Sequence, residues 1–476
     1  MRFGTYLVAL LVFAAGARAE DFRITPMPDG GLPVVQPGFS FRSPGLGWYL
    51  AGNIKPENGV IKGGESYKLY FPHAAEGWSD AELSVEVVTW PTEMTGTPDL
   101  RRFLREAGGE TPSTNPHESL TEEMLNGATC AVLRWESDRW SAPNSPLIKT
   151  SAVHRVCAHP DMPGFALDLQ YYAETPQANA EIAAVIASLR FTPVPYHVRE
   201  IRPGCQIGRL VEADGALWTI CKGDSLLSSH GTVLRIDPTT NSIAKTIEVG
   251  PQPWDIAVAG GQIWVGDFNG KIVRIDPKTN AVMATVAVPG HTMQVLSSGG
   301  FVWVQALDLQ KGATLVRIDP ASASIVATIP FGMAACVEAG RWLFLRDVKD
   351  EWWRLDGQTG EVIDGFAPER KILDIRYDGR FAWVLQKEAG GTAMLKFDPE
   401  NPATPERVRL LDGFVSDAVW WNGDLCTLEA RVVRCRANGN GPAKEVPRWA
   451  GLGRLLVFAG SMWVPTGTSI LRLDPK

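Results

Sequence analysis

The sequence predicts a seven-bladed β-propeller that follows a smaller α+β domain, and two repeating patterns support this prediction. The first pattern is Gly, any residue, an apolar residue and then usually Trp; its leading glycines, from Gly215 to Gly460, lie 46, 39, 40, 39, 44 and 37 residues apart. The second is Arg-Ile-Asp-Pro or a close variant, as at residues 235–238 and 274–277. Seven units of roughly 40 residues with alternating apolar positions are typical of four-stranded blades.

The punctuation between the strands has a physical basis. Gly permits left-handed turns, Pro fixes φ, and an Asp side chain can accept hydrogen bonds from the turn amides. We expect the recurrent Trp to pack blade against blade. The sequence stops at Lys476, directly after the third strand expected in the last blade. We therefore expect residues 197–201 to supply the fourth strand and close the ring, which leaves no exposed sheet edge there.

The repeat resembles a known group of propellers. Residues 253–258, 261–265 and 270–277 are similar to the repeats of YncE/YVTN-type propellers and of the related virginiamycin B lyase superfamily. This resemblance extends over the repeat region and implies the fold, but such propellers serve many roles. Lyases of the related superfamily are metal-assisted, so the resemblance implies one alternative function, a metal-dependent lyase or lactonase acting at the propeller axis.

The first 19 residues have the parts of a secretory signal peptide. Arg2 is the positive region, residues 7–15 are apolar, and Ala17-Arg-Ala19 is a small-x-small cleavage site. We expect the mature chain to be exported to the periplasm. No later segment reaches the ~18 consecutive apolar residues that a membrane-spanning helix needs.

Residues 20–192 lack the repeat and are expected to form a separate α+β domain, with the propeller over residues 193–476. Strands are expected near residues 39–42, 47–51, 66–71, 83–90, 129–136, 150–158 and 166–173. Helices are expected over residues 99–107, 119–126 and 177–189, the last with one apolar face and a Thr175-Pro176 start. This layout is similar to PsbP-like sandwiches.

The composition bounds the partners. The chain is 45% hydrophobic and 21% charged, which is enough apolar content for a large core. Lys and Arg number 46 against 53 Asp and Glu, a net charge of −7, and no basic footprint is present. We therefore expect no nucleic-acid partner. We also expect no transmembrane segment, and we expect the protein to be a monomer.

The seven cysteines pair by hairpin symmetry. Cys130 and Cys157, Cys205 and Cys221, and Cys426 and Cys435 are each symmetric about a turn or loop. Residues directly opposed in a hairpin meet the short Cβ–Cβ distance of a disulfide, and an exported chain is in an oxidising compartment. We therefore expect three disulfides, with Cys336 left over; the alternative is that all seven are reduced core residues.

A candidate site lies where the first strands of the blades line the central channel. Six residues before each motif glycine come Arg209, Asp255, Gln294, Ala334, Leu373 or Asp374, Asp417 and Arg454, with Asp374 favoured in the fifth blade. Because blades seven and one are neighbours, and blades five and six also, this ring is expected to be cationic on one side and acidic on the other. Nine residues before the glycines, a ring at the mouth of the channel contains Gln206, Gln252, His291, Phe331, Arg370, Phe414 and Gly451.

Three interpretations of the axial residues remain open. The arginines could clamp a carboxylate or phosphate while the acids hold a cationic end. The aspartates could hold a hard cation such as Ca²⁺, which takes several oxygen ligands. The ring could also be a salt-bridged, water-filled pore. No other cofactor motif is present, and His291 is the one histidine that maps near the mouth, so we expect a binding protein for a protein or small anionic ligand rather than an enzyme.

Overall fold

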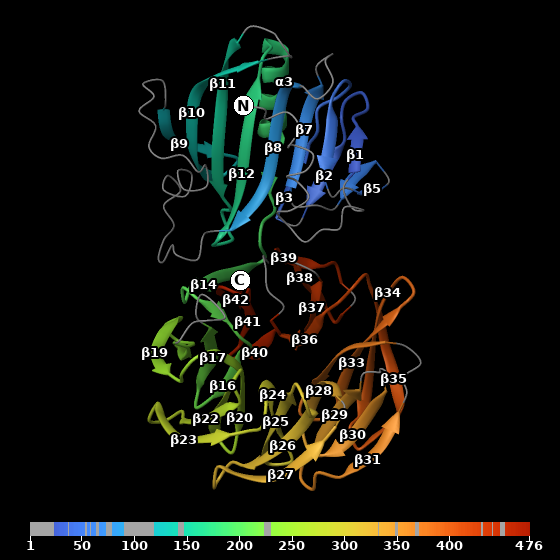
Figure 1. Cartoon of the computed structure of the whole chain (residues 1–476). Coiled ribbons are helices and arrows are strands. Elements are labelled where there is room, and N and C mark those ends of the chain that lie inside the picture. The colour runs from blue at the N-terminus through green and yellow to red at the C-terminus, as the bar shows by residue number, and fades with distance from the viewer. Residues whose placement is uncertain are drawn as a thin grey trace. The chain divides into compact units, whose positions relative to one another are not determined.

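The computed structural model describes residues 23–476 except 37, 53–54, 58, 63–65, 73–78, 90–118, 141–146, 223–229, 332, 348–350, 367–370, 430–431, 440 and 448–452. The chain divides into two compact units, residues 1–195 and residues 196–476 (Figure 1). Among the described residues, no helix has the length and apolar character that crossing a membrane requires.

The N-terminal unit contains two sheets and one described helix. Its elements are β1 (Arg23–Pro26), β2 (Pro33–Gln36), β3 (Phe39–Arg42), β4 (Tyr49–Gly52), β5 (Lys55–Glu57), β6 (Val60–Lys62), β7 (Ser66–Pro72), β8 (Ser79–Thr89), β9 (Ser119–Leu125), β10 (Ala128–Trp140), β11 (Leu147–Ala158), β12 (Phe165–Ala173), α3 (Pro176–Ser188) and β13 (Arg190–Phe191). The larger sheet has the order β1-β4-β7-β8-β12-β11-β10-β9, and the smaller has the order β13-β3-β2-β6-β5.

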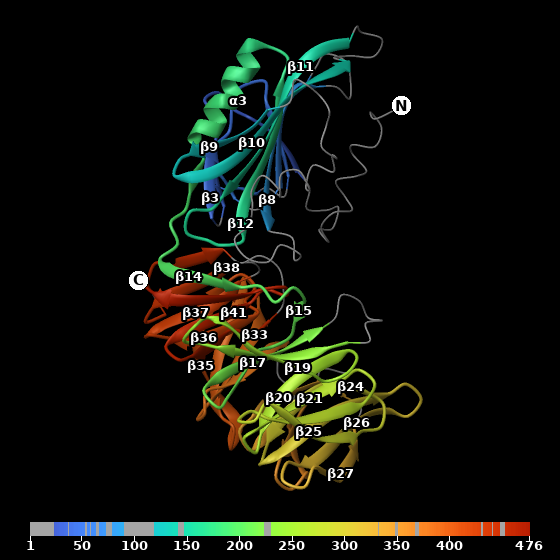
Figure 2. The same cartoon turned by 90° about the vertical axis from the view of Figure 1, so that its left-hand side faces the viewer.

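Helix α3 covers one face of the larger sheet, as Figure 2 shows. Thr175 caps the first turn of the helix by accepting a hydrogen bond from the amide of Ala178 at 3.1 Å. Ile182 and Val185 of the helix are buried. The predicted helix over residues 119–126 is wrong, because this segment is the edge strand β9, antiparallel to β10. The predicted helix over residues 99–107 lies outside the described residues.

The second unit is a seven-bladed β-propeller, as the repeat predicts. Its strands are β14 (Tyr196–Ile201), β15 (Gln206–Ile207), β16 (Val211–Ala213), β17 (Ala216–Lys222), β18 (Thr232–Asp237), β19 (Ser242–Glu248), β20 (Pro253–Ala259), β21 (Gln262–Asp267), β22 (Lys271–Asp276), β23 (Ala281–Ala287), β24 (His291–Ser298), β25 (Phe301–Asp308), β26 (Gly312–Asp319), β27 (Ser324–Pro330), β28 (Met333–Ala339), β29 (Trp342–Asp347), β30 (Trp352–Asp356), β31 (Val362–Phe366), β32 (Ile372–Tyr377), β33 (Ala382–Glu388), β34 (Gly391–Asp398), β35 (Asn401–Asp412), β36 (Asp417–Trp421), β37 (Asp424–Glu429), β38 (Val432–Ala437), β39 (Lys444–Pro447), β40 (Leu456–Phe458), β41 (Ser461–Pro465) and β42 (Ile470–Pro475).

Seven antiparallel sheets follow one another along this unit. Blade 1 is β15 and β16 followed by β17 to β19, and blades 2 to 6 each contain four consecutive strands. Blade 7 has the order β14-β42-β41-β40, so its fourth strand comes from the start of the unit. The register pairs Val198 with Leu473, and it runs from Tyr196 opposite Pro475 to Ile201 opposite Ile470. The expected closure of the ring is confirmed.

The motif glycines occupy turns that require a left-handed backbone. All seven, from Gly215 to Gly460, have positive φ between 64° and 99°. A side chain is strained in this region of φ/ψ space, which explains why the repeat begins with Gly. The residue before the glycine also has positive φ in blades 1, 2, 3, 6 and 7, as at Asp214 and Asn422. This is the geometry of tight hairpin turns between the first and second strands.

The recurrent Trp and Arg form a cross-strand pair in most blades. Trp264 is opposite Arg274 on β21 and β22, and the same register pairs Trp218 with Arg235 and Trp463 with Arg472. The guanidinium carbon of Arg274 lies 6.0 Å from the Trp264 ring centre. In blade 6, the disulfide cysteines 426 and 435 hold this same position, so a covalent link stands where other blades have a cation–π contact.

The arginine of this pair also reaches the next blade, where it donates to main-chain carbonyl groups in the turn after the third strand. These contacts join Arg235 to Pro277 (3.2 Å), Arg274 to Pro320 and Ala321 (2.9 and 3.0 Å), Arg317 to Gln358 (2.6 Å), Arg354 to Pro399 and Glu400 (2.8 and 2.6 Å), and Arg472 to Pro238. The aspartate that follows caps its own turn, as Asp237 does for the amide of Thr239 at 2.7 Å. The Arg-Ile-Asp-Pro repeat therefore encodes both the turn and the joint between blades.

The hydrophobic core lies between neighbouring blades. Trp218, Trp264, Trp303 and Trp463 are each 0% exposed. Trp218 packs in one cluster with Ile256 of the next blade, and Trp264 packs with Val295 of the blade after that. The Trp repeat is therefore a packing feature, as expected.

The three predicted disulfides are present, and they join Cys130 to Cys157, Cys205 to Cys221, and Cys426 to Cys435. Cys336 is free and buried, and burial raises the pKa of its thiol well above the usual value.

Candidate functional site

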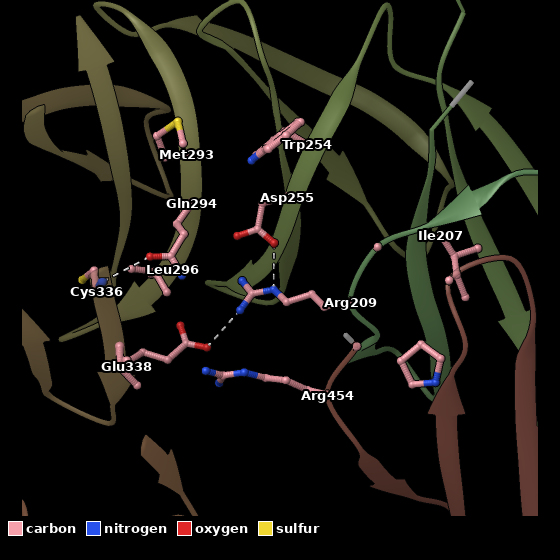
Figure 3. Close-up of a pocket in the computed structure, with 15 residues that line it drawn as sticks. Ile207, Arg209, Trp254, Asp255, Met293, Gln294, Leu296, Cys336, Glu338 and Arg454 are labelled. Carbon is pink, nitrogen blue, oxygen red and sulfur yellow. Dashed lines mark hydrogen bonds and ion pairs between the residues drawn. The ribbon is translucent and has the colours of Figure 1, made fainter. Parts of the chain in front are cut away.

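A pocket of about 370 Å³ opens at the propeller axis, between the first strands of blades 1 to 4 and the start of blade 7. Its walls include the residues at four of the seven predicted axial positions, which are Arg209, Asp255, Gln294 and Arg454. Figure 3 shows Arg209, Asp255, Arg454 and Glu338 directed into the same space, with Trp254 and Met293 at one side. The pocket therefore combines a charged part with an apolar part.

Arg209 is held on every side. Its Nε donates to the carbonyl oxygen of Ile256 at 2.5 Å and lies 3.1 Å from Oδ1 of Asp255. Its Nη2 donates to the carbonyl oxygen of Val295, and its Nη1 is 3.7 Å from Oε1 of Glu338. Because these contacts come from blades 2, 3 and 4, Arg209 fixes the geometry of the axis.

The acceptors on the inner strands bind the backbone of the next blade. Oδ2 of Asp255 accepts from the amide of Val295 at 2.9 Å, and Oε1 of Gln294 accepts from the amide of Cys336 at 3.3 Å. Oδ2 of Asp417 accepts from the amide of Leu455 at 2.6 Å. These contacts follow one pattern around the ring, and they satisfy inner-strand amides that face the channel.

On the far side of the axis, arginines and aspartates alternate. Arg376 binds Asp417 bidentately, with Nε 2.7 Å from Oδ1, and its Nε is 3.6 Å from Oδ2 of Asp374. Arg454 donates through Nη2 to Oδ1 of Asp374 at 2.6 Å. The expected division into a cationic side and an acidic side is wrong, because Arg376 lies between the two aspartates and Asp255 and Glu338 lie beside Arg209.

Two of these groups have displaced pKa values. Burial raises the pKa of Asp374, while the positive charges of Arg454 and Arg376 act in the opposite direction. Burial and the nearby Arg376 lower the pKa of Arg454, and Arg209 adds to this effect. The negative charges of Asp374 and Asp417 oppose this shift, so three arginines and several carboxylates lie close together at the axis.

The register corrects one axial position. In blade 4, Ala335 pairs with Arg346 as Asp255 pairs with Gly266, so Ala335 rather than Ala334 is the axial residue. The reason is that Gly340 is the first turn residue of its hairpin, whereas Gly261 is the second. In blade 5 the register selects Asp374, the favoured alternative, which pairs with Leu385 as Asp417 pairs with Leu428 in blade 6.

The mouth residues are placed less uniformly. Gln206 is an exposed residue of β15, Gln252 has φ +51° in the turn before β20, and Phe414 is 60% exposed. Phe331 is half-buried against the cluster between blades 3 and 4. Arg370 and Gly451 lie outside the described residues.

His291 belongs to an aromatic stack beside the pocket. Its ring stacks on Phe268, with ring centres 4.4 Å apart, and its Nδ1 is 3.0 Å from the Phe268 carbonyl oxygen. The ring centres of Phe268 and Trp254 are 5.4 Å apart, and the ammonium group of Lys222 lies 4.3 Å from the Trp254 ring centre. Burial lowers the pKa of Lys222, and Asp255 opposes that shift. The stack holds Trp254 in place as a wall of the pocket.

Two charged residues of this region were missed in the sequence analysis. Glu338 and Arg376 lie three and two positions after the axial residues of their blades, and a search at one fixed offset from the glycines passes over them. A search for every charged residue on the inner strands finds both. Within the described part of the chain, no group of three or more His, Cys, Asp or Glu side chains is arranged to hold a metal ion.

Comparisons with known proteins add little beyond the fold. A family described as a domain of unknown function (DUF5074) matches residues 206–342. The search of curated proteins found no match. Among solved structures, the Cps50 (Swd1) β-propeller domain from Myceliophteria thermophila is 14% identical, with a TM-score of 0.46, and the match covers 59% of this chain and 100% of that one. BamB from Moraxella catarrhalis is 15% identical, with a TM-score of 0.42, and the match covers 58% of this chain and 96% of that one.

Proposed function

We propose that this protein is an exported binding protein whose axial pocket holds a small anionic ligand, with Arg454 as the anchoring residue. The observation that carries the proposal is the state of the Arg454 side chain. One of its nitrogens, Nη2, donates to Oδ1 of Asp374, and 36% of the side chain is exposed. A guanidinium group has five donors in a planar fork, so donors remain for a carboxylate or phosphate.

The free donors of Arg454 favour an anion. Burial lowers the pKa of Arg454, and the charges of Arg376 and Arg209 add to this effect, while those of Asp374 and Asp417 oppose it. A bound anion would give the remaining nitrogens of Arg454 a second charged partner beside Asp374, in a partly enclosed space where electrostatic interactions are stronger than in water. A metal cation would find few free ligands at Asp255 and Asp417, because these two carboxylates already accept hydrogen bonds from backbone amides and arginines.

Export to the periplasm is part of the proposal. It is supported by the three disulfides, because disulfides persist in oxidising compartments. The signal-peptide pattern of residues 1–19 agrees with it.

Isothermal titration calorimetry of the mature chain with acetate, benzoate, 3-phenylpropionate and inorganic phosphate tests the binding proposal. We expect at least one of these anions to bind, and Arg454→Gln to weaken that binding about tenfold or more, because a charge-assisted hydrogen bond is lost. The matched control is Arg380→Gln, which removes an exposed arginine in the turn between β32 and β33. No binding by any of the anions, or equal weakening by both variants, would contradict the proposal.

A further inference from the structure

The pocket exposes two opposite charges, and these define a narrower class of ligand than an anion alone. Arg454 is 36% exposed at the side chain and Glu338 is 34% exposed, whereas Arg209 and Asp255 are 19% and 15% exposed. In Figure 3, the guanidinium group of Arg454, from the segment before β40, and the carboxylate of Glu338, from β28, enter the pocket beneath Arg209. The accessible charges of the pocket are therefore one positive and one negative group.

Neither of these groups satisfies the other. Among the described residues, no ion pair within 4.0 Å joins Glu338 to Arg454, and the partners of Arg454 and Glu338 are Asp374 and Arg209 respectively. Glu338 uses Oε2 to accept from the amide of Ser297 at 2.7 Å, while its Oε1 is 3.7 Å from Arg209, beyond hydrogen-bond distance. Oε1 of Glu338 and the remaining nitrogens of Arg454 are therefore available to a ligand.

The remaining walls are apolar. Trp254, Met293, Leu296 and Ile207 line the pocket around the charged groups. The Trp254 ring contacts both Lys222 and Phe268, and these neighbours restrict its movement. A volume of about 370 Å³ is at the small end of ligand sites, which range over roughly 300–1,000 Å³.

We propose that the pocket recognises a small zwitterion of the amino-acid type that carries an apolar substituent. The carboxylate binds Arg454, the ammonium group binds Oε1 of Glu338, and the substituent packs on Trp254 and Met293. This inference rests on the proposed function, since it assigns the anion to the same arginine. It adds Glu338 as the residue that separates zwitterions from simple anions, because an amine-free ligand leaves Oε1 of Glu338 without a hydrogen-bond donor.

Calorimetry with three ligands of one shape tests this inference. Phenylalanine has both charges, 3-phenylpropionate lacks the amine, and 2-phenylethylamine lacks the carboxylate. We expect phenylalanine to bind about tenfold or more tightly than either of the others, as the loss of one charge-assisted contact implies.

Variants of the two residues separate the two proposals. Glu338→Gln keeps an oxygen for the Ser297 amide, and we expect it to weaken the binding of phenylalanine about tenfold and to leave the binding of 3-phenylpropionate unchanged. We expect Arg454→Gln to weaken the binding of both ligands. Glu361→Gln, an exposed residue in the outer turn of blade 4, is the control for loss of one negative charge. If 3-phenylpropionate binds as tightly as phenylalanine and Glu338→Gln has no effect, the zwitterion inference is overturned and the anion site stands. If no member of either ligand series binds, both proposals fail.

Discussion

Closure of the ring by β14 and β42 is the prediction with the largest expected effect. Residues 470–476 contain Ile470, Leu471 and Leu473, which are 0%, 3% and 0% exposed. Burying each such side chain contributes roughly 1.5–3 kcal/mol, so their joint removal costs about 5–9 kcal/mol. Globular domains are stable by only about 5–15 kcal/mol. Deletion of residues 470–476 is therefore expected to remove most of the stability of the propeller.

A graded test uses two residues that oppose each other across the closing pair. Leu473→Ala is expected to lower the free energy of unfolding by about 2–5 kcal/mol, because it leaves a cavity in a buried site. For a unit of this size, 1 kcal/mol corresponds to about 2–4 °C in Tm, so the transition should fall by about 4–20 °C. Val198 lies opposite Leu473 in the register, and it belongs to the other end of the unit.

Differential scanning calorimetry of Val198→Ala, Leu473→Ala and the double variant measures the coupling directly. Residues in contact show coupling of about 0.5–3 kcal/mol, whereas independent sites are additive within about 0.5 kcal/mol. Val457→Ala, at a residue 37% exposed on β40, serves as the control and should change the transition little. Additive effects at residues 198 and 473, or an unchanged transition after deletion of residues 470–476, would refute closure.

Three further predictions concern the blades and the axis. Arg274→Met removes two hydrogen bonds to the next blade, so it is expected to lower the free energy of unfolding by about 2–4 kcal/mol in denaturant titrations. The control Lys278→Gln, at an exposed residue, should lower it by less than about 0.5 kcal/mol. Equal effects of the two variants would contradict the inter-blade role of Arg274. Replacing Cys426 and Cys435 by Ala opens a loop with a sequence separation of 9, so the free energy of unfolding should fall by about 2.5 kcal/mol in the same titration. A wild-type stability that does not change on addition of reductant would contradict the presence of this disulfide. Because burial raises the folded-state pKa of Asp374 above the usual 3.8, the stability of wild type relative to Asp374→Asn should rise as the pH falls through that raised pKa and level off below 3.8; a relative stability that falls with the pH would have the wrong sign.

The repeat made most of the propeller predictable. Once the glycines are aligned, the pattern transfers strand positions from the regular blades to the irregular ones. The pairing of Cys426 with Cys435 was predictable from their symmetry about the turn between them, and the structure confirms that disulfide. The closing strand was predictable because residues 197–201 align with the strand before blade 2.

The arrangement of charges at the axis was harder to predict. An alignment assigns one position per blade, whereas an arginine side chain is long enough to reach two blades away, as Arg454 does to Asp374. Arg376 was missed because the alignment had already assigned Asp374 as the axial residue of blade 5. Arg376 lies two residues after Asp374 on the same strand face, and it contacts both Asp374 and Asp417. The axial residue predicted for blade 4 was wrong by one position, because Gly340 is the first residue of its turn, whereas Gly261 of blade 2 is the second.

Local preference misled the prediction for residues 119–125. This segment contains Leu120, Met124 and two glutamates, which all favour helix in isolation. In the structure it pairs with β10 over seven residues, and this tertiary pairing overrides the intrinsic preference.

The measurement that tests the central claim most directly is the affinity of the mature chain for small anions, compared between wild type and Arg454→Gln by calorimetry. We predict binding of at least one anion by wild type, about a tenfold or greater loss in Arg454→Gln, and an unchanged affinity in Arg380→Gln. A wild-type chain that binds none of the anions, or an Arg454→Gln variant that binds as tightly as wild type, would contradict an anion site at the propeller axis.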